Sequence, residues 1–309
     1  MKSCSRRTAL ASVLALLAAC GGNDDETPGT VVQVAQADAR FSILAEAIVA
    51  ADLATTLSGA GPFTVFAPTN DAFAALLTEL GVTKSQLLAD KALLTAVLTY
   101  HVLLARVSRS QVPAGRAITT VQGSIFKVDA TASGLVVTDG RNRTANVTAT
   151  DISASNGLIH AIDKVLLPAD KNIVETAQAN PDFSILVEAV VAAGLGAALS
   201  AAGPLTVFAP TNAAFAGLLA ELGVTKAQLL GNTALLTQVL TYHVVSGRVL
   251  RADVPTGAPI ATLEGDTFAV NGSLVIADQR ARTANVVVTD VLASNGVIHV
   301  IDKVLLPQP

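Results

Sequence analysis

Four histidines are the residues best suited to acid–base or metal chemistry in this chain. They are His101, His160, His243 and His299. The first and third each follow a tyrosine, whereas the second and fourth lie in the sequences IHAID and IHVID. The four therefore occupy two kinds of position, each written twice. Such a pattern fits either a repeated chemical site or a repeated piece of scaffold.

No ligand or catalytic pattern surrounds these histidines. Metal sites need two or more converging ligands, yet no two histidines lie within four residues of each other, and neither HExxH nor His-x-His occurs. The G-x-S-x-G turn of many serine hydrolases is missing too. A serine–histidine–aspartate triad needs no fixed spacing, so that alternative stays open. We expect no catalytic residue, no bound metal and no cofactor.

The N-terminus has the pattern of an export signal. Three basic residues precede a short apolar run that ends in LAAC at 17–20. This ending resembles the lipobox of bacterial lipoproteins, in which a peptidase cuts before a cysteine that carries diacylglycerol. We expect residues 1–19 to be a lipoprotein signal peptide, Cys20 to carry the lipid and residues 20–30 to form a flexible tether. The alternative is an ordinary signal peptide with a chance cysteine.

The composition favours a globular chain and argues against nucleic-acid binding. Of 309 residues, 51% are hydrophobic and 14% charged, and the formal net charge is −4, whereas a nucleic-acid-binding face is basic. The twenty residues from Ala189 to Phe208 carry no charge. Glycines and a Gly-Pro pair interrupt them, so we expect a buried helix followed by a strand and not a membrane span.

The chain is one unit written twice. FTVFAPTNDAF returns as LTVFAPTNAAF, and SNGLIHAIDKVLLP returns as SNGVIHVIDKVLLP. The offset is 142 residues early and 139 late, so the second copy lacks three residues, between about 271 and 276. Such a length change belongs in a surface hairpin. A period this long indicates two whole domains, at 31–168 and 171–307.

Each unit begins with helical patterns and ends with strand patterns. Asp38 and Asn180 precede amphipathic runs and are expected to begin helices. The later segments predict strands separated by glycine and asparagine turns. Their sequences are AITTVQGSIFKVDA, GLVVTDG, ANVTATDI and LIHAIDKVLL. Helices followed by strands make an α+β domain.

The repeated TVFAPTN stretch has a structural interpretation at every position. Val65 and Phe66 belong to a β-rich run that we expect to be a strand buried against the helices. Pro68 cannot donate to a strand ladder, so the strand should stop there. Thr69 or Asn70 should then cap the next helix by accepting a bond from a free amide.

These sequences resemble the fasciclin domain, a module of adhesion proteins. The resemblance covers both repeats end to end. One family box matches TVFAPTNDAF and TVFAPTNAAF, another matches IHAIDKVLLP and IHVIDKVLLP, and the family's Tyr-His pair falls on YH in each copy. The resemblance implies two tandem domains, each a β wedge or sandwich of about seven strands with several packed α-helices. It also implies adhesion or ligand binding without a reaction.

The resemblance marks two sets of candidate residues. In animal members the Tyr-His region contributes to integrin binding, a partner that does not carry over to a bacterial envelope protein. We expect Tyr100-His101 and Tyr242-His243 to be mainly structural, with a contact role as the alternative. The remaining box residues are expected to build the scaffold: Thr69, Asn70, Thr211, Asn212, His160, Asp163, His299 and Asp302.

The expected function is that of a non-enzymatic, lipid-anchored adhesion or interaction protein of the cell envelope, in the outer membrane if the source is Gram-negative. Its partner would be a protein or polysaccharide at the cell surface, and only the lipid would meet the membrane. The alternative is a periplasmic or surface binding protein for a small ligand or polysaccharide. A deep apolar pocket with converging polar groups would favour that alternative.

Overall fold

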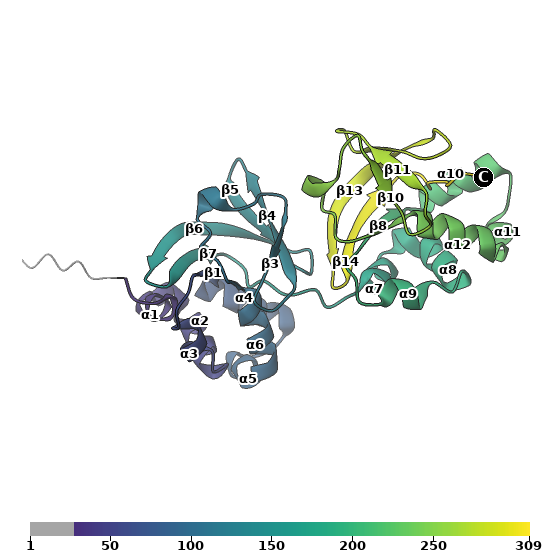
Figure 1. Ribbon diagram of the computed structural model, residues 1–309. Helices are drawn as coiled ribbons and strands as arrows, with labels where there is room; N and C mark the ends of the chain where they lie inside the picture. Colours follow the sequence, from purple (N-terminus) through teal and green to yellow (C-terminus); the bar gives the residue numbers. More distant parts are fainter. Residues whose placement is uncertain (1–27) are drawn as a thin grey trace, which may run out of the picture.

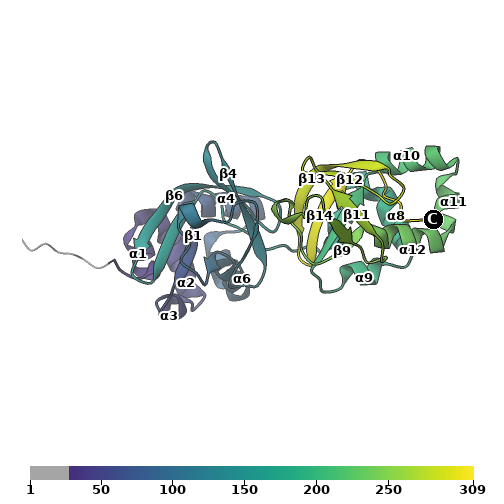
Figure 2. The same cartoon turned by 45° about the horizontal axis from the view of Figure 1, so that its top comes forward.

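Two domains of the same design lie end to end in the computed structural model, which describes residues 28–309 (Figure 1). In each lobe the strands gather on one side and the helices on the other, and the second view shows this separation clearly in the second domain (Figure 2). No helix among the described residues is long and apolar enough to cross a membrane.

The first domain has six α-helices among its described residues. They are α1 (Val31–Ala37), α2 (Ser42–Ala50), α3 (Ala54–Leu57), α4 (Asn70–Leu80), α5 (Lys84–Ala89) and α6 (Lys91–Tyr100), with 3-10 turns η1 (Ala39–Phe41) and η2 (Arg109–Gln111). Its strands are β1 (Phe63–Pro68), β2 (Val102–Leu103), β3 (Ala117–Thr119), β4 (Ile125–Thr131), β5 (Gly134–Thr138), β6 (Thr144–Ala154) and β7 (Gly157–Ile162).

The second domain repeats this order. Its helices are α7 (Ile173–Gln178), α8 (Ser184–Ala192), α9 (Gly196–Ser200), α10 (Asn212–Leu222), α11 (Lys226–Gly231) and α12 (Thr233–Tyr242), with η3 (Pro181–Phe183) and η4 (Arg251–Asp253). Its strands are β8 (Leu205–Pro210), β9 (Val244–Ser246), β10 (Pro259–Ala261), β11 (Thr267–Val270), β12 (Val275–Ala277), β13 (Thr283–Ala293) and β14 (Gly296–Ile301).

Each domain holds one seven-stranded sheet. The strand order is β2-β1-β7-β6-β5-β4-β3 in the first domain and β10-β11-β12-β13-β14-β8-β9 in the second. Strand β1 runs parallel to β7, in a register that pairs Phe66 with His160, and the other neighbours are antiparallel. The family's two boxes therefore lie side by side at the centre of the sheet, although about ninety residues separate them along the chain.

The sheet separates two hydrophobic cores in each domain. In the first domain Val65 and Ile159 face the helices and pack into the larger core with residues such as Phe73. Phe66 faces the other way and joins a core that β3 to β6 enclose, where its ring meets Phe126 edge-on at 4.9 Å between centroids. The sheet must curl to enclose that second core, which gives the domain its wedge shape.

Three local expectations need correction. Phe66 is buried against the curled sheet instead of the helices, because successive side chains of a strand point to opposite faces. The strand expected over LIHAIDKVLL ends at Ile162, since the segment after it binds side chains of other elements. Asp38 and Asn180 cap the 3-10 turns η1 and η3, and the helices α2 and α8 follow only after these turns.

The three-residue length difference falls in a hairpin. The β4–β5 turn of the first domain is replaced by the shorter β11–β12 turn around Asn271. The stretch Ala189–Phe208 contains the end of α8, all of α9 and most of β8, so a helix is followed by a strand as predicted, with a further short helix between them. The helical part is not buried throughout, because Val191 is 69% exposed.

Candidate functional site

Tyr100 lies at the end of α6 and is fully buried under the curled sheet. Its hydroxyl donates to the Ile125 carbonyl at 2.6 Å and accepts the amide of Gly140 at 2.8 Å. Burial raises the pKa of this phenol far above its ordinary value, and the charge of Asp139 adds to the shift. The hydroxyl therefore stays protonated and ties α6 to two parts of the sheet.

His101 follows directly and begins the connection from α6 to β2. Its Nδ1–H donates to the Val97 carbonyl at 2.7 Å, and its Nε2 accepts the amide of Leu166 at 2.9 Å. These two bonds require the neutral ring, because a second proton would face the Leu166 N–H. Burial accordingly lowers the pKa of His101 from 6.5 to about 4, although its bond to Val97 opposes the shift.

The second domain repeats this arrangement at Tyr242 and His243. The Tyr242 hydroxyl donates to the Thr267 carbonyl at 2.9 Å. His243 donates to Val239 at 2.7 Å and accepts from Leu305 at 2.9 Å, and burial again lowers its pKa to about 4. The structure thus places both Tyr-His pairs inside the domains, each between the last helix and the sheet.

The other two histidines lie on the central strands and bind backbone as well. His160 donates from Nε2 to the Val107 carbonyl at 2.9 Å and accepts the amide of Asp151 at Nδ1 at 3.2 Å. His299 makes the equivalent bonds to Val249, at 2.9 Å, and Asp290, at 3.3 Å. Burial lowers the pKa of His299. Every ring nitrogen of the four histidines therefore has a backbone partner.

The remaining box residues also form structural hydrogen bonds, which cap helices or join neighbouring segments. Thr69 caps α4 by accepting the amide of Ala72 at 3.4 Å. Asn70 does not cap α4; it accepts the amide of Ile43 at 3.0 Å and donates to the Ala39 carbonyl at 2.8 Å, which joins α2 and η1 to α4. Thr211, Asn212 and their partners repeat both arrangements. Asp163 binds the backbone and side-chain amides of Asn146 at 2.7 Å each, and Asp302 binds Asn285 likewise.

This double architecture matches one family of known domains. The model of the fasciclin domain matches residues 39–168 and 181–307. The chain belongs to the fasciclin domain family. That finding confirms the predicted family and, with the two helix-covered sheets, the α+β fold class.

Relatives of these fasciclin domains occur in animals and bacteria. The chain is 33% identical over 255 residues to transforming growth factor-beta-induced protein ig-h3 of Oryctolagus cuniculus, an alignment that covers 82% of this chain and 36% of that protein. It is 51% identical over 138 residues to protein sll1483 of Synechocystis, covering 44% of this chain and 73% of that one. Human periostin is 26% identical over 260 residues, covering 82% and 28%.

A solved fasciclin domain pair, from the insect cell adhesion molecule fasciclin I, aligns with 89% of this chain and 95% of its own. The TM-score is 0.43 and the identity 19%. The chain spans about a third of the length of ig-h3 and of periostin.

One buried ion pair of the fasciclin scaffold was not singled out from the sequence. Asp139 follows β5 and is 1% exposed; its carboxylate accepts Nε and Nη2 of Arg143 at 3.0 and 2.9 Å and the amide of Leu167 at 3.0 Å. Asp278 and Arg282 stand at the equivalent positions of the second domain. The repeated D-x-R-x-R spacing was the available indication of this turn.

The two fasciclin domains also contact each other. Ile125 of the first domain packs with Leu250, Leu292 and Val297 of the second. Asn142 donates to the Leu292 carbonyl at 3.0 Å and accepts the Leu292 amide at 2.6 Å. Sequence repetition could not reveal this contact, because the position of Asn142 is held by Ala281 in the second copy.

Two expectations have no direct counterpart in this geometry. Cys20, with the predicted signal peptide and most of the tether, lies outside the described residues. Among residues 28–309, no group of three or more His, Cys, Asp or Glu side chains is placed to hold a metal ion.

Proposed function

We propose that this chain is a non-enzymatic interaction protein of the cell envelope, attached to the membrane by lipid on Cys20. Its two fasciclin domains present their outer surfaces to a protein or polysaccharide at the cell surface. The family supports the general role, because fasciclin domains occur in adhesion proteins. The lipobox-like LAAC sequence supports the anchor.

The main support for a non-enzymatic role is that every ring nitrogen of the four histidines is already hydrogen-bonded to the backbone. A general base needs a ring nitrogen within reach of a substrate proton. In both domains each nitrogen instead binds a backbone group of the same domain. The tyrosine hydroxyls and the carboxylates of Asp139 and Asp163 are used in the same way. The reactive groups of the family boxes thus hold the fold together.

The anchor would hold both domains at the same membrane surface. Two acyl chains suffice for stable membrane attachment. A tethered pair of domains then meets its partner at a high effective concentration. Uncharged hydrogen-bonding side chains would supply the contacts to a polysaccharide, since the chain has no tryptophan and both its tyrosines are buried.

The test compares cells that carry the full-length chain with cells that carry Cys20→Ala. We expect the unaltered protein to fractionate with membranes and incorporate labelled palmitate, and its cells to adhere to one another or to matrix more strongly. Cys20→Ala, expressed behind a signal peptide that is cleaved without lipid attachment, should be soluble and unlabelled, and its cells should lose the added adhesion.

Purified Cys20→Ala protein, added in excess, should compete with the adhesion of cells that carry the anchored form. Equal adhesion with and without the anchor would contradict the proposal, as would a failure of the soluble protein to compete. A Cys20→Ala protein that still incorporates labelled palmitate would contradict lipid attachment at Cys20.

A further inference from the structure

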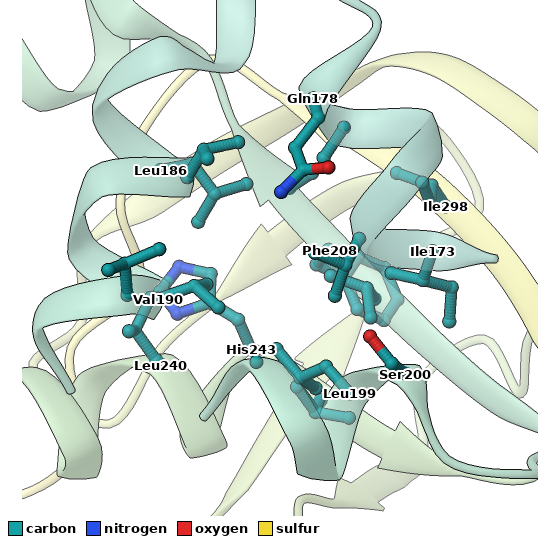
Figure 3. Close-up of a pocket in the computed structure, with 18 residues that line it drawn as sticks. Ile173, Gln178, Leu186, Val190, Leu199, Ser200, Phe208, Leu240, His243 and Ile298 are labelled. Atoms are coloured by element: carbon teal, nitrogen blue, oxygen red, sulfur yellow. The ribbon is translucent and has the colours of Figure 1, made fainter. Parts of the chain in front are cut away.

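The second domain contains a cavity of about 140 Å³ between its central strands and its helices α7, α8 and α9. Figure 3 shows apolar side chains on several sides of it, with Ile173 and Leu186 contributed by helices and Ile298 by strand β14. His243 lies at its inner wall and is neutral, because both ring nitrogens bind backbone groups. None of the side chains that line the cavity belongs to an acidic residue, a lysine or an arginine.

An apolar cavity of this size holds a particular class of molecule. Cavities lined by Leu, Ile and Phe stay dry, and one of about 150 Å³ in another protein binds benzene. The volume here therefore suits one aromatic ring or an aliphatic chain of similar size. A charged group would lose its hydration and find no partner inside, which excludes ionic ligands from the cavity itself.

Two uncharged polar side chains stand at the edge of this space. The Gln178 amide and the Ser200 hydroxyl point toward it from opposite sides (Figure 3), and both residues are exposed. An amide and a hydroxyl can each donate and accept a hydrogen bond. A ligand with an apolar body and a neutral polar end would place its body in the cavity and its polar end between these two groups.

The equivalent side chains of the first domain are slightly less exposed to solvent. Phe41, Leu44 and Ile48 are 0%, 2% and 3% exposed, whereas their counterparts Phe183, Leu186 and Val190 are 4%, 6% and 7% exposed.

Four residues on the wall differ between the copies. Ile173 and Val187 are larger than their counterparts Val31 and Ala45 in the first domain, whereas two other residues are smaller. Val190 stands for Ile48, and Gly196 stands for Ala54. A Cβ added at Gly196 would meet no atom within 4 Å. Gly196 can therefore take the alanine of the first domain without a clash in α9.

We propose that the second fasciclin domain binds a small, uncharged amphiphile, with one ring or a chain of about the same volume inside this cavity and a neutral polar end at Gln178 and Ser200. This site goes beyond the proposed adhesive role, and neither depends on the other. The first domain, whose equivalent side chains are slightly less exposed, would bind the same ligand more weakly.

The test uses three probes that share one ring: benzyl alcohol, toluene and benzoate. They are titrated into the full-length chain carrying Cys20→Ala, and methyl NMR follows Leu199 and its first-domain counterpart Leu57. We expect benzyl alcohol to shift Leu199 saturably and leave Leu57 unchanged. Toluene should bind more weakly, and benzoate at least tenfold more weakly.

The decisive variant carries Val190→Ile and Gly196→Ala, the residues of the first domain. It should fold, melt at a higher temperature because the cavity is smaller, and bind benzyl alcohol at least tenfold more weakly. Ser200→Ala should weaken benzyl alcohol but not toluene, and its matched control Ser58→Ala in the first domain should change neither. Unchanged binding in the double variant, equal binding of benzoate, or no saturable shift with any probe would overturn the proposal.

Discussion

Lys127 of the first domain and Asp290 of the second form an ion pair across the domain boundary, with 3.0 Å between Nζ and Oδ2. The Asp290 side chain is 2% exposed and that of Lys127 is 13% exposed. Burial lowers the pKa of Lys127, but the bonds and charges of Asp290 and Asp129 outweigh it and raise the pKa above its ordinary value. The lysine therefore stays charged, and the pair fixes one domain against the other.

Replacing Asp290 by Asn should remove the ion pair with Lys127 and leave the local turn intact. Asp290 has φ 61°, a conformation that Asn tolerates, and an Asn side chain can still accept the Arg251 amide now bound at 2.7 Å. We expect a loss of about 1–3 kcal/mol in the coupling between domains, since Lys127 keeps a buried charge without this partner. Small-angle scattering should show a wider distribution of domain separations.

The first domain offers a matched control for that variant. Asp151 occupies the equivalent turn, with φ 58° and the same bond to an arginine amide, yet it is exposed. Asp151→Asn should leave scattering and stability nearly unchanged. Equal effects of the two variants would mean that the turn, and not the ion pair, is responsible.

Alanine substitutions at three residues around the start of α4 should reduce stability by different amounts. Asn70→Ala should lower the free energy of unfolding by about 1–2 kcal/mol, because it leaves the Ile43 amide and the Ala39 carbonyl without their partner. Thr69→Ala should lose about 1 kcal/mol of capping energy. Asp71→Ala should change stability by a few tenths of a kcal/mol, since Asp71 is exposed and only favours the helix dipole.

Urea unfolding followed by circular dichroism measures all three. The matched control comes from the second domain, where Ala213 already stands at the position of Asp71 and Thr211 caps α10. Thr211→Ala should therefore lose about as much as Thr69→Ala. A large loss with Asp71→Ala would contradict the scaffold interpretation of this stretch.

Stability should depend on pH through His101 and His243. Each has a folded pKa of about 4, below the ordinary value of 6.5. Above about pH 6.5 the ring is neutral in both the folded and the unfolded chain. Between 6.5 and 4 only the unfolded chain binds the proton, so stability falls as pH falls, by about 1.4 kcal/mol per pH unit for each ring.

The slope of the unfolding free energy against pH measures this effect. His101→Asn keeps a hydrogen-bonding side chain but removes the titrating ring. In that variant, the slope for the first domain should fall by the amount that corresponds to one bound proton. The slope for the second domain should be unchanged. An unaltered slope in both domains would show that His101 is not the group involved.

Each domain should also fold as a separate fragment. Residues 31–168 and 171–307 each contain a helix-side and a sheet-side core. The cluster around Ile125 is the one hydrophobic core among the described residues that crosses the boundary. Both fragments should therefore melt cooperatively by circular dichroism. Fragments that gain structure only when mixed would show one intertwined domain instead.

The sequence predicted most of the fold because local patterns and repetition agree. Strand β1 ends at Pro68 and Thr69 caps α4, as expected from residue type and position. The direction in which Phe66 points was mispredicted, since an all-apolar strand carries no alternation that would tell its two faces apart.

The less predictable features depend on contacts between distant segments. Lys127 looks like an exposed strand residue until the second domain covers it, and its counterpart Ala269 gave no indication of a partner. The cavity beside Val190 lies between helices and strands that are far apart in the sequence. Neither the pattern of residue types nor the repeat in the sequence predicts such contacts.

The central claim is that the buried family residues build the scaffold while the outer surface meets the partner. One measurement tests it most directly: the melting temperature and the cell adhesion of His243→Ala, determined side by side on the full-length chain. We expect the melting temperature of the second domain to fall, with a loss of about 1–3 kcal/mol, because the Leu305 amide and the Val239 carbonyl lose their partner. Adhesion should persist at temperatures where the variant is still folded. An unchanged melting temperature together with abolished adhesion would contradict the account and make the Tyr-His pair a contact site.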